Sequence, residues 1–333
     1  MPVLPSTTEL AALLRSGDRA ALGRAITLVE SSRPEDQSRA RALLQACAPP
    51  ATPAQRIGIT GIPGVGKSTL IDALGSALVQ AGHRVAVLAV DPTSQRSGGS
   101  ILGDKTRMER LSQLQEAFVR PTAAGGTLGG VARRTRETIL LCEAAGFDRI
   151  LVETVGVGQS EWEVDRMTDL NLLLMIAGAG DELQGIKRGI MESADLVVLT
   201  KVEGDQRPRA EAAARDLRNA IHLLPVRPSG EHPPVLLVSA LSGEGIHALA
   251  AELERRQAQA LERGSLHARR HDQARHWMRQ AVLDGLRDRL TTDPLVAARY
   301  AELEAAVQAG TLSPFDAADG VLALFRTGDA PRP

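Results

Sequence analysis

The chain has 333 residues, of which 43% are hydrophobic, so it is long enough to bury the core of one large soluble domain. Its 39 basic and 40 acidic residues give a formal net charge of -1, and its few aromatic residues are scattered, so we expect no nucleic-acid partner. The two distant cysteines, and the lack of a basic leader or an apolar run of ~20 residues, favour a cytoplasmic protein with no membrane association.

Residues 1–50 carry apolar side chains at helical spacing. The pattern predicts two or three amphipathic helices between residues 7 and 47, and the prolines at positions 49, 50 and 53 end this module. We therefore expect an N-terminal helical extension over residues 1–50. The apolar positions that define it are Leu10, Leu13, Leu14, Leu22, Ile26 and Val29.

From residue 55 onward, short apolar runs alternate with helical patterns. Strands that alternate with helices in this way are typical of a doubly wound, mostly parallel sheet. We therefore expect an α/β fold whose central domain spans residues 51–263, with helical extensions at both ends. The expected strands lie at residues 56–60, 85–90, 117–119, 149–152, 170–176, 196–199 and 235–238.

The chain becomes helical again after Gly264. Periodic apolar positions predict helices around residues 277–290, 295–307 and 314–325. We expect a C-terminal helical region over residues 264–328, which either packs on the sheet or builds an oligomer, followed by a tail at residues 329–333.

A phosphate-binding loop follows the first expected strand. The pattern Gly61-x4-Gly66-Lys67-Ser68 opens a helix expected over residues 68–78, which is the context that this motif requires. Glycines let the backbone wrap the phosphates, and successive N–H groups at the helix N-terminus attract negative charge. We expect Lys67 to bind the β and γ phosphates and Ser68 to bind Mg²⁺. The expected phosphate contacts are Gly61, Pro63, Gly64, Val65, Gly66, Lys67, Ser68 and Thr69.

Three acidic residues are candidates for the rest of the Mg²⁺ site. Asp91 and Glu153 each follow an expected strand, and the ligand crevice of an open α/β sheet lies at such strand ends. Asp104 lies in the glycine-rich stretch between them. The alternative for each of these carboxylates is a helix cap or a turn.

Three more residues are candidates for the γ-phosphate side of the site. Gly156 follows Glu153 closely enough for its backbone N–H to contact the γ phosphate. Gln159 is a candidate for positioning the attacking water, and Arg107 for neutralising charge during phosphoryl transfer. A solvated loop glutamine and a surface arginine are the alternatives.

Two later segments suit a guanine pocket. Thr200-Lys201-Val202-Glu203 and Ser239-Ala240-Leu241 each follow an expected strand, and they resemble the Asn/Thr-Lys-x-Asp and Ser-Ala elements of GTPases. In such a pocket the lysine stem covers the base, and the carboxylate accepts hydrogen bonds from the guanine ring N–H and amino group, a donor pair that adenine lacks. Glu203 replaces the usual aspartate and Thr200 the usual asparagine. The sequence favours GTP over ATP and leaves the pocket geometry open.

Together these segments resemble one family, the MeaB/ArgK-type P-loop GTPases that assist adenosylcobalamin-dependent methylmalonyl-CoA mutase. The resemblance covers most of residues 55–205 and implies a P-loop NTPase fold of the SIMIBI-like G-domain type. Its motifs are Gly-Ile-Pro-Gly-Val-Gly-Lys-Ser-Thr (61–69), Ala-Val-Asp-Pro-Thr-Ser (89–94), Gly-Asp-Lys-Thr-Arg-Met (103–108), Gly-Gly-Val-Ala-Arg-Arg-Thr-Arg-Glu-Thr (129–138), Glu-Thr-Val-Gly-Val-Gly-Gln-Ser-Glu (153–161) and Gly-Ala-Gly-Asp-Glu-Leu-Gln-Gly-Ile-Lys-Arg-Gly-Ile (178–190).

The resemblance assigns roles to these positions. It implies that Asp91, Asp104 and Glu153 complete the Mg²⁺ environment and that residues 92–107 and 154–165 are switch regions. It implies a third switch at residues 178–187, which the residues alone would identify as an ordinary strand-to-helix loop. The coupling residues of that switch would be Asp181, Glu182, Gln184 and Lys187.

The function implied is a GTP-hydrolysing chaperone that gates loading or removal of adenosylcobalamin and protects an acyl-CoA mutase of the methylmalonyl-CoA mutase type. The resemblance also implies a homodimer, and it makes the mutase's adenosyltransferase a candidate partner. No Asp-x-His-x-x-Gly cobalamin signature occurs in the chain, so the cobalamin would sit on a partner.

Two alternatives remain open. A nickel-insertion metallochaperone GTPase would share the phosphate loop, and its metal ligands would come from the loose group His267, His271 and His276. An ArgK-like kinase linked to amino-acid transport would need a second substrate pocket with a base, which we do not find in the sequence.

Overall fold

A computed structural model describes residues 5–47, 52–90, 108–122, 128–154, 160–178, 188–223, 226 and 231–327. Its centre is one sheet of seven strands in the order β3-β2-β4-β1-β5-β6-β7, and every strand pair is parallel. The predicted doubly wound parallel sheet is confirmed. The strands are β1 (Gln55–Gly61), β2 (Val85–Val90), β3 (Ala117–Thr122), β4 (Arg149–Thr154), β5 (Leu170–Ile176), β6 (Leu196–Thr200) and β7 (Val235–Val238).

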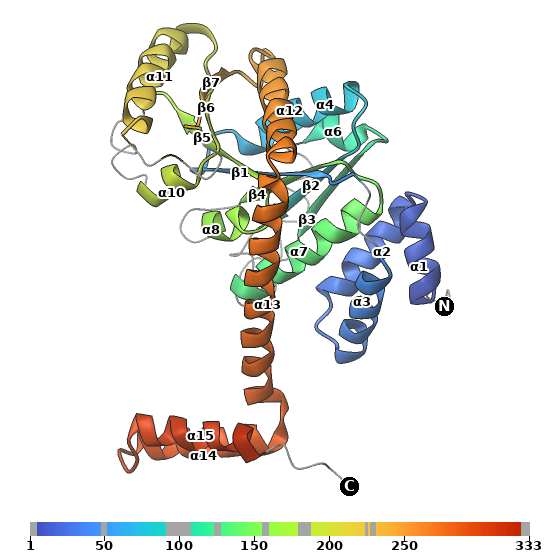
Figure 1. Cartoon of the computed structure of the whole chain (residues 1–333), viewed down its shortest axis with the longest axis vertical. Coiled ribbons are helices and arrows are strands. Elements are labelled where there is room, and N and C mark those ends of the chain that lie inside the picture. Colours follow the sequence, from blue (N-terminus) through green and yellow to red (C-terminus); the bar gives the residue numbers. More distant parts are fainter. Residues whose placement is uncertain are drawn as a thin grey trace. The chain divides into compact units, whose positions relative to one another are not determined.

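Helices cover both faces of the sheet, because successive residues of a buried strand point to opposite faces (Figure 1). On β5, Leu172 and Leu174 join the core beneath α4 and α12, whereas Leu173 and Met175 join the core beneath α11. One face carries α4 (Lys67–Gln80), α6 (Glu109–Gln113) and α12 (Ile246–Glu262). The other carries α7 (Leu128–Ala144), α8 (Ser160–Asp165), α10 (Arg188–Ser193) and α11 (Arg207–Ile221), which follows the short 3-10 helix η2 (Gly204–Gln206).

The N-terminal segment forms three helices, α1 (Thr7–Arg15), α2 (Arg19–Glu30) and α3 (Pro34–Ala46). A capping box at Ser6 starts α1, and the Asp18 side chain accepts from the Ala21 N–H at the start of α2. The helices pack on one another and on α7. An ion pair of 2.6 Å between Arg120 of β3 and Glu30 fastens them to the edge strand of the sheet.

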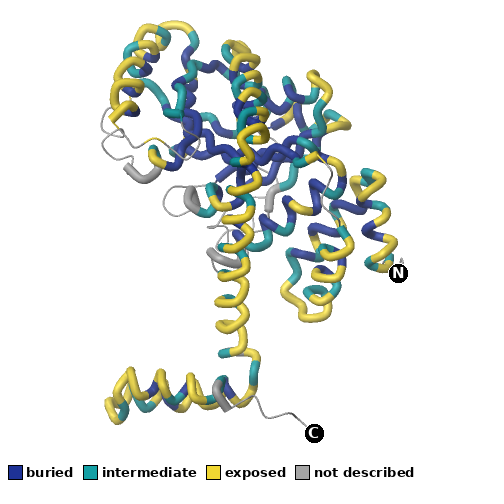
Figure 2. Tube along the Cα trace, in the orientation of Figure 1, coloured by how far each residue is buried: buried dark blue, intermediate teal, exposed yellow. Residues whose placement is uncertain are grey.

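The chain divides into two compact units, residues 1–273 and 274–333. Helix α13 (Ser265–Thr292) contributes to both, and α14 (Pro294–Gln308) and α15 (Pro314–Thr327) belong to the second. Within the second unit, α14 and α15 share a small apolar core of Val296, Leu303, Ala317 and Val321. Figure 2 shows the larger buried core of the first unit in and around the sheet. Among the described residues, no helix combines the length with the hydropathy that a membrane span requires. The domain boundaries that the sequence suggests stay predictions.

Gly58 tests how tightly the sheet is packed against α8, and Gly23 of α2 serves as the control. A Cβ at Gly58 of β1 would lie 2.2 Å from Asn171 Oδ1 and 2.5 Å from Val164 Cγ1, whereas a Cβ at Gly23 of α2 would meet nothing within 4 Å. We expect Gly58→Ala to lower the free energy of unfolding by about 1–3 kcal/mol through overpacking. We expect Gly23→Ala to raise it by about 0.5–1 kcal/mol, because alanine favours the helix. Urea unfolding of both variants checks this, and a neutral Gly58→Ala would contradict the packing described.

Candidate functional site

The phosphate loop joins the central strand β1 to helix α4. Its backbone needs glycine at three positions, because φ is 151° at Gly61, 79° at Gly64 and 99° at Gly66. At Gly61 a side chain is also excluded by space, since a Cβ would lie 2.6 Å from the Leu174 carbonyl oxygen of β5. The loop therefore turns directly at the carboxyl end of β1 and delivers the chain into the N-terminus of α4. That helix end attracts anions.

Lys67, the first residue of α4, is only 8% exposed. Its ammonium group donates to the carbonyl oxygens of Gly61, at 2.7 Å, and of Ile62, at 3.2 Å. A positive charge is thus held inside the loop, beside the backbone N–H groups of the helix start. This arrangement can bind the phosphates of a nucleotide.

Ser68 and Glu153 meet beside the loop. Glu153 lies next to Ile59 in the parallel register of β4 and β1, and its carboxylate accepts a hydrogen bond of 2.9 Å from the Ser68 hydroxyl. Glu153 is 4% exposed. A hydroxyl and a carboxylate are hard oxygen donors of the kind that Mg²⁺ prefers. Among the residues that the structure describes, no group of three or more His, Cys, Asp or Glu side chains could hold a metal by itself.

Thr200 and Lys201 connect the expected base pocket to the phosphate loop. The Thr200 hydroxyl lies 2.7 Å from the Val65 carbonyl oxygen and 3.2 Å from that of Met175, and the Lys201 ammonium donates to the Gly64 carbonyl at 2.8 Å. Lys201 has a φ of 58°, and in the described part of the chain it is the one residue other than glycine with positive φ. Sequence reasoning did not predict the contact between Thr200 and the loop.

Glu203 supplies a carboxylate with unused hydrogen-bonding capacity. Its Oε2 atom is buried and has no hydrogen-bond partner. A buried acceptor without a donor is costly, so such an atom points to a ligand or an ordered water that would supply one. Ser239 is fully buried where the chain leaves β7, and its hydroxyl accepts from the Ser242 N–H at 3.2 Å. Ala240 is half-buried and Leu241 is exposed.

The structure thus places Lys67, Ser68 and Glu153 together, with Thr200 and Lys201 bonded to the same loop. Nine further expected site residues lie outside the described residues and stay predictions. They are Asp91, Asp104, Arg107, Gly156, Gln159, Asp181, Glu182, Gln184 and Lys187. Cys142 is a poor candidate for thiol chemistry because burial raises its pKa far above the usual range.

The contact between Thr200 and Val65 can be tested with two substitutions. Thr200→Val keeps the shape and removes the hydroxyl, so the loop carbonyl loses its donor. We expect about five- to ten-fold weaker binding of GDP by titration, from the loss of one buried hydrogen bond. Thr200→Ser keeps the hydroxyl and should bind GDP within about two-fold of the unsubstituted chain. Equal binding by Thr200→Val would contradict a role of this contact in the site.

The family model described as methylmalonyl-CoA mutase-associated GTPase MeaB matches residues 22–294. A putative GTPase of Caulobacter vibrioides is 56% identical over 94% of this chain and 95% of its own length. The GTPase ArgK of Escherichia coli K12 is 44% identical over 90% of this chain and 91% of its own length.

Two further relatives extend the comparison. A mouse protein, the mitochondrial methylmalonic aciduria type A homolog, is 44% identical over 94% of this chain and 78% of its own length. The crystal structure of a LAO/AO transport system kinase superposes with a TM-score of 0.75 at 35% identity, covering 98% of this chain and 100% of that one. With the phosphate loop and its lysine in place, the chain belongs to the MeaB family of methylmalonyl-CoA mutase-associated GTPases.

Proposed function

We propose that this GTPase uses its nucleotide state to gate the loading or removal of adenosylcobalamin on an adenosylcobalamin-dependent acyl-CoA mutase of the methylmalonyl-CoA mutase type, and that it protects that mutase. One observation carries the nucleotide part of the proposal: Lys67, Ser68 and Glu153 converge at the end of β1. The family description supports the mutase as partner.

The proposed roles at the phosphates follow from charge and position. The Lys67 ammonium would exchange the Gly61 and Ile62 carbonyls for β and γ phosphate oxygens. Ser68 and Glu153, with Asp91 and Asp104, would hold Mg²⁺, which supplies charge neutralisation at the phosphates when it is bound. The backbone N–H of Gly156 would contact the γ phosphate. Arg107 would neutralise developing charge and Gln159 would orient the attacking water.

The proposed magnesium site can be tested by removing the metal and its serine ligand. We expect EDTA to weaken GTP binding by the unsubstituted chain, because Mg²⁺ held by Ser68 and Glu153 would neutralise negative charge on the phosphates. Ser68→Ala should bind GTP more weakly when Mg²⁺ is present, and EDTA should then change its affinity little. Isothermal titration with and without EDTA measures both. Undiminished Mg²⁺ dependence in Ser68→Ala would exclude Ser68 as a ligand.

The proposed reader of the base is Glu203. Its buried, unpartnered Oε2 suits the ring N–H and amino group of guanine, and Lys201, held beside the phosphate loop, would cover the base. Ser239, Ala240 and Leu241 would line the other side of the pocket.

A polarity change at Glu203 tests this assignment. Gln at this position has one acceptor and one donor, so it mismatches the guanine amino group and matches the carbonyl that xanthine has there. We expect Glu203→Gln to bind GDP about 10- to 100-fold more weakly and to gain affinity for xanthosine diphosphate. Glu211→Gln is the matched control, because Glu211 is an exposed carboxylate that pairs with Arg207 on the surface of α11. A GDP affinity that survives Glu203→Gln would refute the assignment.

The proposed link to the mutase is the segment with Asp181, Glu182, Gln184 and Lys187, which follows β5 in the chain. The test is a pull-down with the adenosylcobalamin-dependent acyl-CoA mutase of the same organism, with GDP and with a non-hydrolysable GTP analogue. We expect a complex whose affinity differs between the two nucleotides, with the adenosyltransferase as a further component to be probed. A mutase that is not retained in either state would overturn the chaperone proposal.

We also propose a homodimer formed through the second compact unit. Met278, Val282 and Leu286 lie at four-residue spacing on α13 and are 62%, 56% and 46% exposed. An apolar stripe of this kind favours an interface over contact with water.

The alternatives have direct tests as well. The kinase hypothesis is supported by the name of one structural relative, a LAO/AO transport system kinase. Release of phosphate to water, without transfer to another acceptor, would exclude it. A metallochaperone would bind Ni²⁺ or Zn²⁺ stoichiometrically, and the described residues contain no cluster of three or more ligands for that purpose.

A further inference from the structure

The first turns of α13 hold the end of α8. The last carbonyl groups of a helix have no hydrogen-bond donor within the helix. At the C-terminal end of α8, two side chains of α13 donate to carbonyl groups of this kind. The Gln273 Nε2 group donates to the carbonyl oxygens of Thr168, at 2.8 Å, and of Asp165, at 3.2 Å. The Arg269 guanidinium donates to the Thr168 carbonyl at 3.1 Å and to the Asp165 carboxylate at 2.8 Å. Helix α8 is thereby capped from a segment about 100 residues away in the chain.

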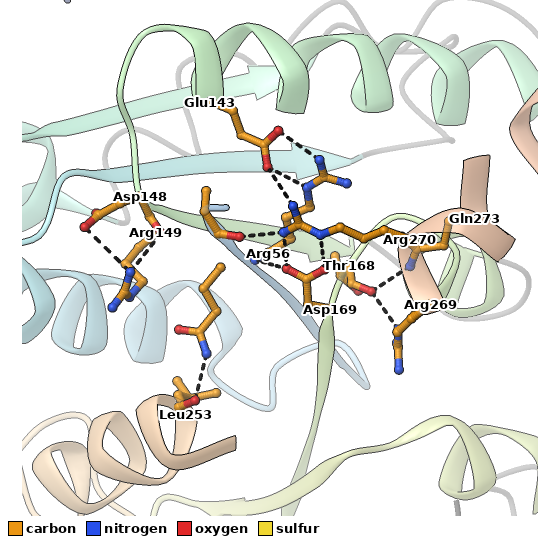
Figure 3. Close-up of polar contacts among 12 residues, drawn as sticks. Arg56, Glu143, Asp148, Arg149, Thr168, Asp169, Leu253, Arg269, Arg270 and Gln273 are labelled. Atoms are coloured by element: carbon orange, nitrogen blue, oxygen red, sulfur yellow. Dashed lines mark hydrogen bonds and ion pairs between the residues drawn. The ribbon is translucent and has the colours of Figure 1, made fainter. Parts of the chain in front are cut away.

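The neighbouring Arg270 fastens the same turn of α13 to the sheet (Figure 3). Its guanidinium binds both carboxylate oxygens of Asp169, at 2.8 and 2.6 Å, just before β5 begins. Asp169 also accepts from the backbone N–H of Arg56 in β1, at 2.9 Å. Arg56 in turn makes two bonds of 2.8 Å to Glu143 of α7. Because α13 is fixed to the sheet at this point, Arg269 and Gln273 fix the end of α8 relative to the sheet.

The hydrogen bonding of Gln273 favours a role for its donor group. The residue is 6% exposed, its Nε2 makes both contacts, and its Oε1 is buried with no hydrogen-bond partner. A buried amide oxygen without a donor costs free energy, and a methionine would fill a similar volume without that cost. Packing alone therefore does not account for glutamine at this position.

Helix α8 is close in the chain to the phosphate site. Glu153, which accepts from the Ser68 hydroxyl, is the second-last residue of β4. Strand β4 ends at Thr154, and α8 begins at Ser160. The helix also packs on β1, β4 and β5. The position of α8 therefore bears directly on β4, whose Glu153 bonds Ser68.

We propose that Arg269 and Gln273 are positioning residues for GTP hydrolysis, acting through α8 on β4, the strand that carries Glu153. This inference rests on the proposed placement of Glu153 at the metal and phosphates. Without the two donors, α8 shifts and the hydrolytic step slows. Nucleotide affinity is kept, because Lys67 and Glu203 lie on other elements.

The test uses Gln273→Met and Arg269→Met in the full chain, with kcat and KM for GTP hydrolysis and Kd for GDP as readouts. We expect kcat to fall about five-fold in each variant, as one or two hydrogen bonds are lost, with KM and Kd within about two-fold. Arg120→Met is the matched control, because the Arg120 and Arg269 side chains are both 25% exposed and each pairs with a carboxylate. Its kcat should equal that of the unsubstituted chain. The melting temperature of each variant is measured first, and all assays are run below the lowest of them.

A second variant separates hydrogen bonding from packing. Gln273→Glu keeps the length but, when ionised, cannot donate to the two carbonyls, so its kcat should lie below that of Gln273→Met. Protonation restores one donor, so its kcat relative to the unsubstituted chain should rise as the pH falls. Unchanged kcat in Gln273→Met and Arg269→Met, an equal loss in Arg120→Met, or a change confined to KM would each overturn the inference. Absence of GTP hydrolysis by the unsubstituted chain would instead count against the proposed function.

Discussion

The parallel pairing of β1 with β4 on one side and β5 on the other is the constraint on which the site depends. Its register sets Glu153 beside Ile59, so the carboxylate reaches the Ser68 hydroxyl at 2.9 Å. The same register places Gly61 beside Leu174 so closely that no side chain fits there. A shift of one residue in either pair would turn these groups to the opposite face of the sheet. The position of the phosphate loop is therefore a property of the whole sheet.

The proposed base pocket and the phosphate loop are connected by hydrogen bonds. Thr200 at the end of β6 and Lys201 bond to the carbonyls of Val65 and Gly64, so the proposed base-binding segment is held directly against the phosphate loop. Threonine at this position, where the GTPase element that the segment resembles has asparagine, thus bonds directly to the loop.

The sequence predicts the features that local patterns encode. Alternating apolar runs locate the strands, and the glycine and lysine spacing locates the phosphate loop. The strand-end rule directs attention to Glu153, whose carboxylate accepts from the Ser68 hydroxyl. The contacts of Arg269 and Gln273 with the end of α8 were not predictable, because they join segments about 100 residues apart and leave no local signature. The unpartnered oxygen of Glu203 depends on how a buried turn is packed, which spacing does not determine either.

A crystal structure of the chain with Mg²⁺ and a non-hydrolysable GTP analogue tests the central claim most directly. The account predicts that the Lys67 ammonium leaves the Gly61 and Ile62 carbonyls for phosphate oxygens, that the metal binds the Ser68 hydroxyl near Glu153, and that Glu203 Oε2 accepts from the guanine. Nucleotide bound with Lys67 still on the loop carbonyls, or with Glu203 remote from the base, would contradict it.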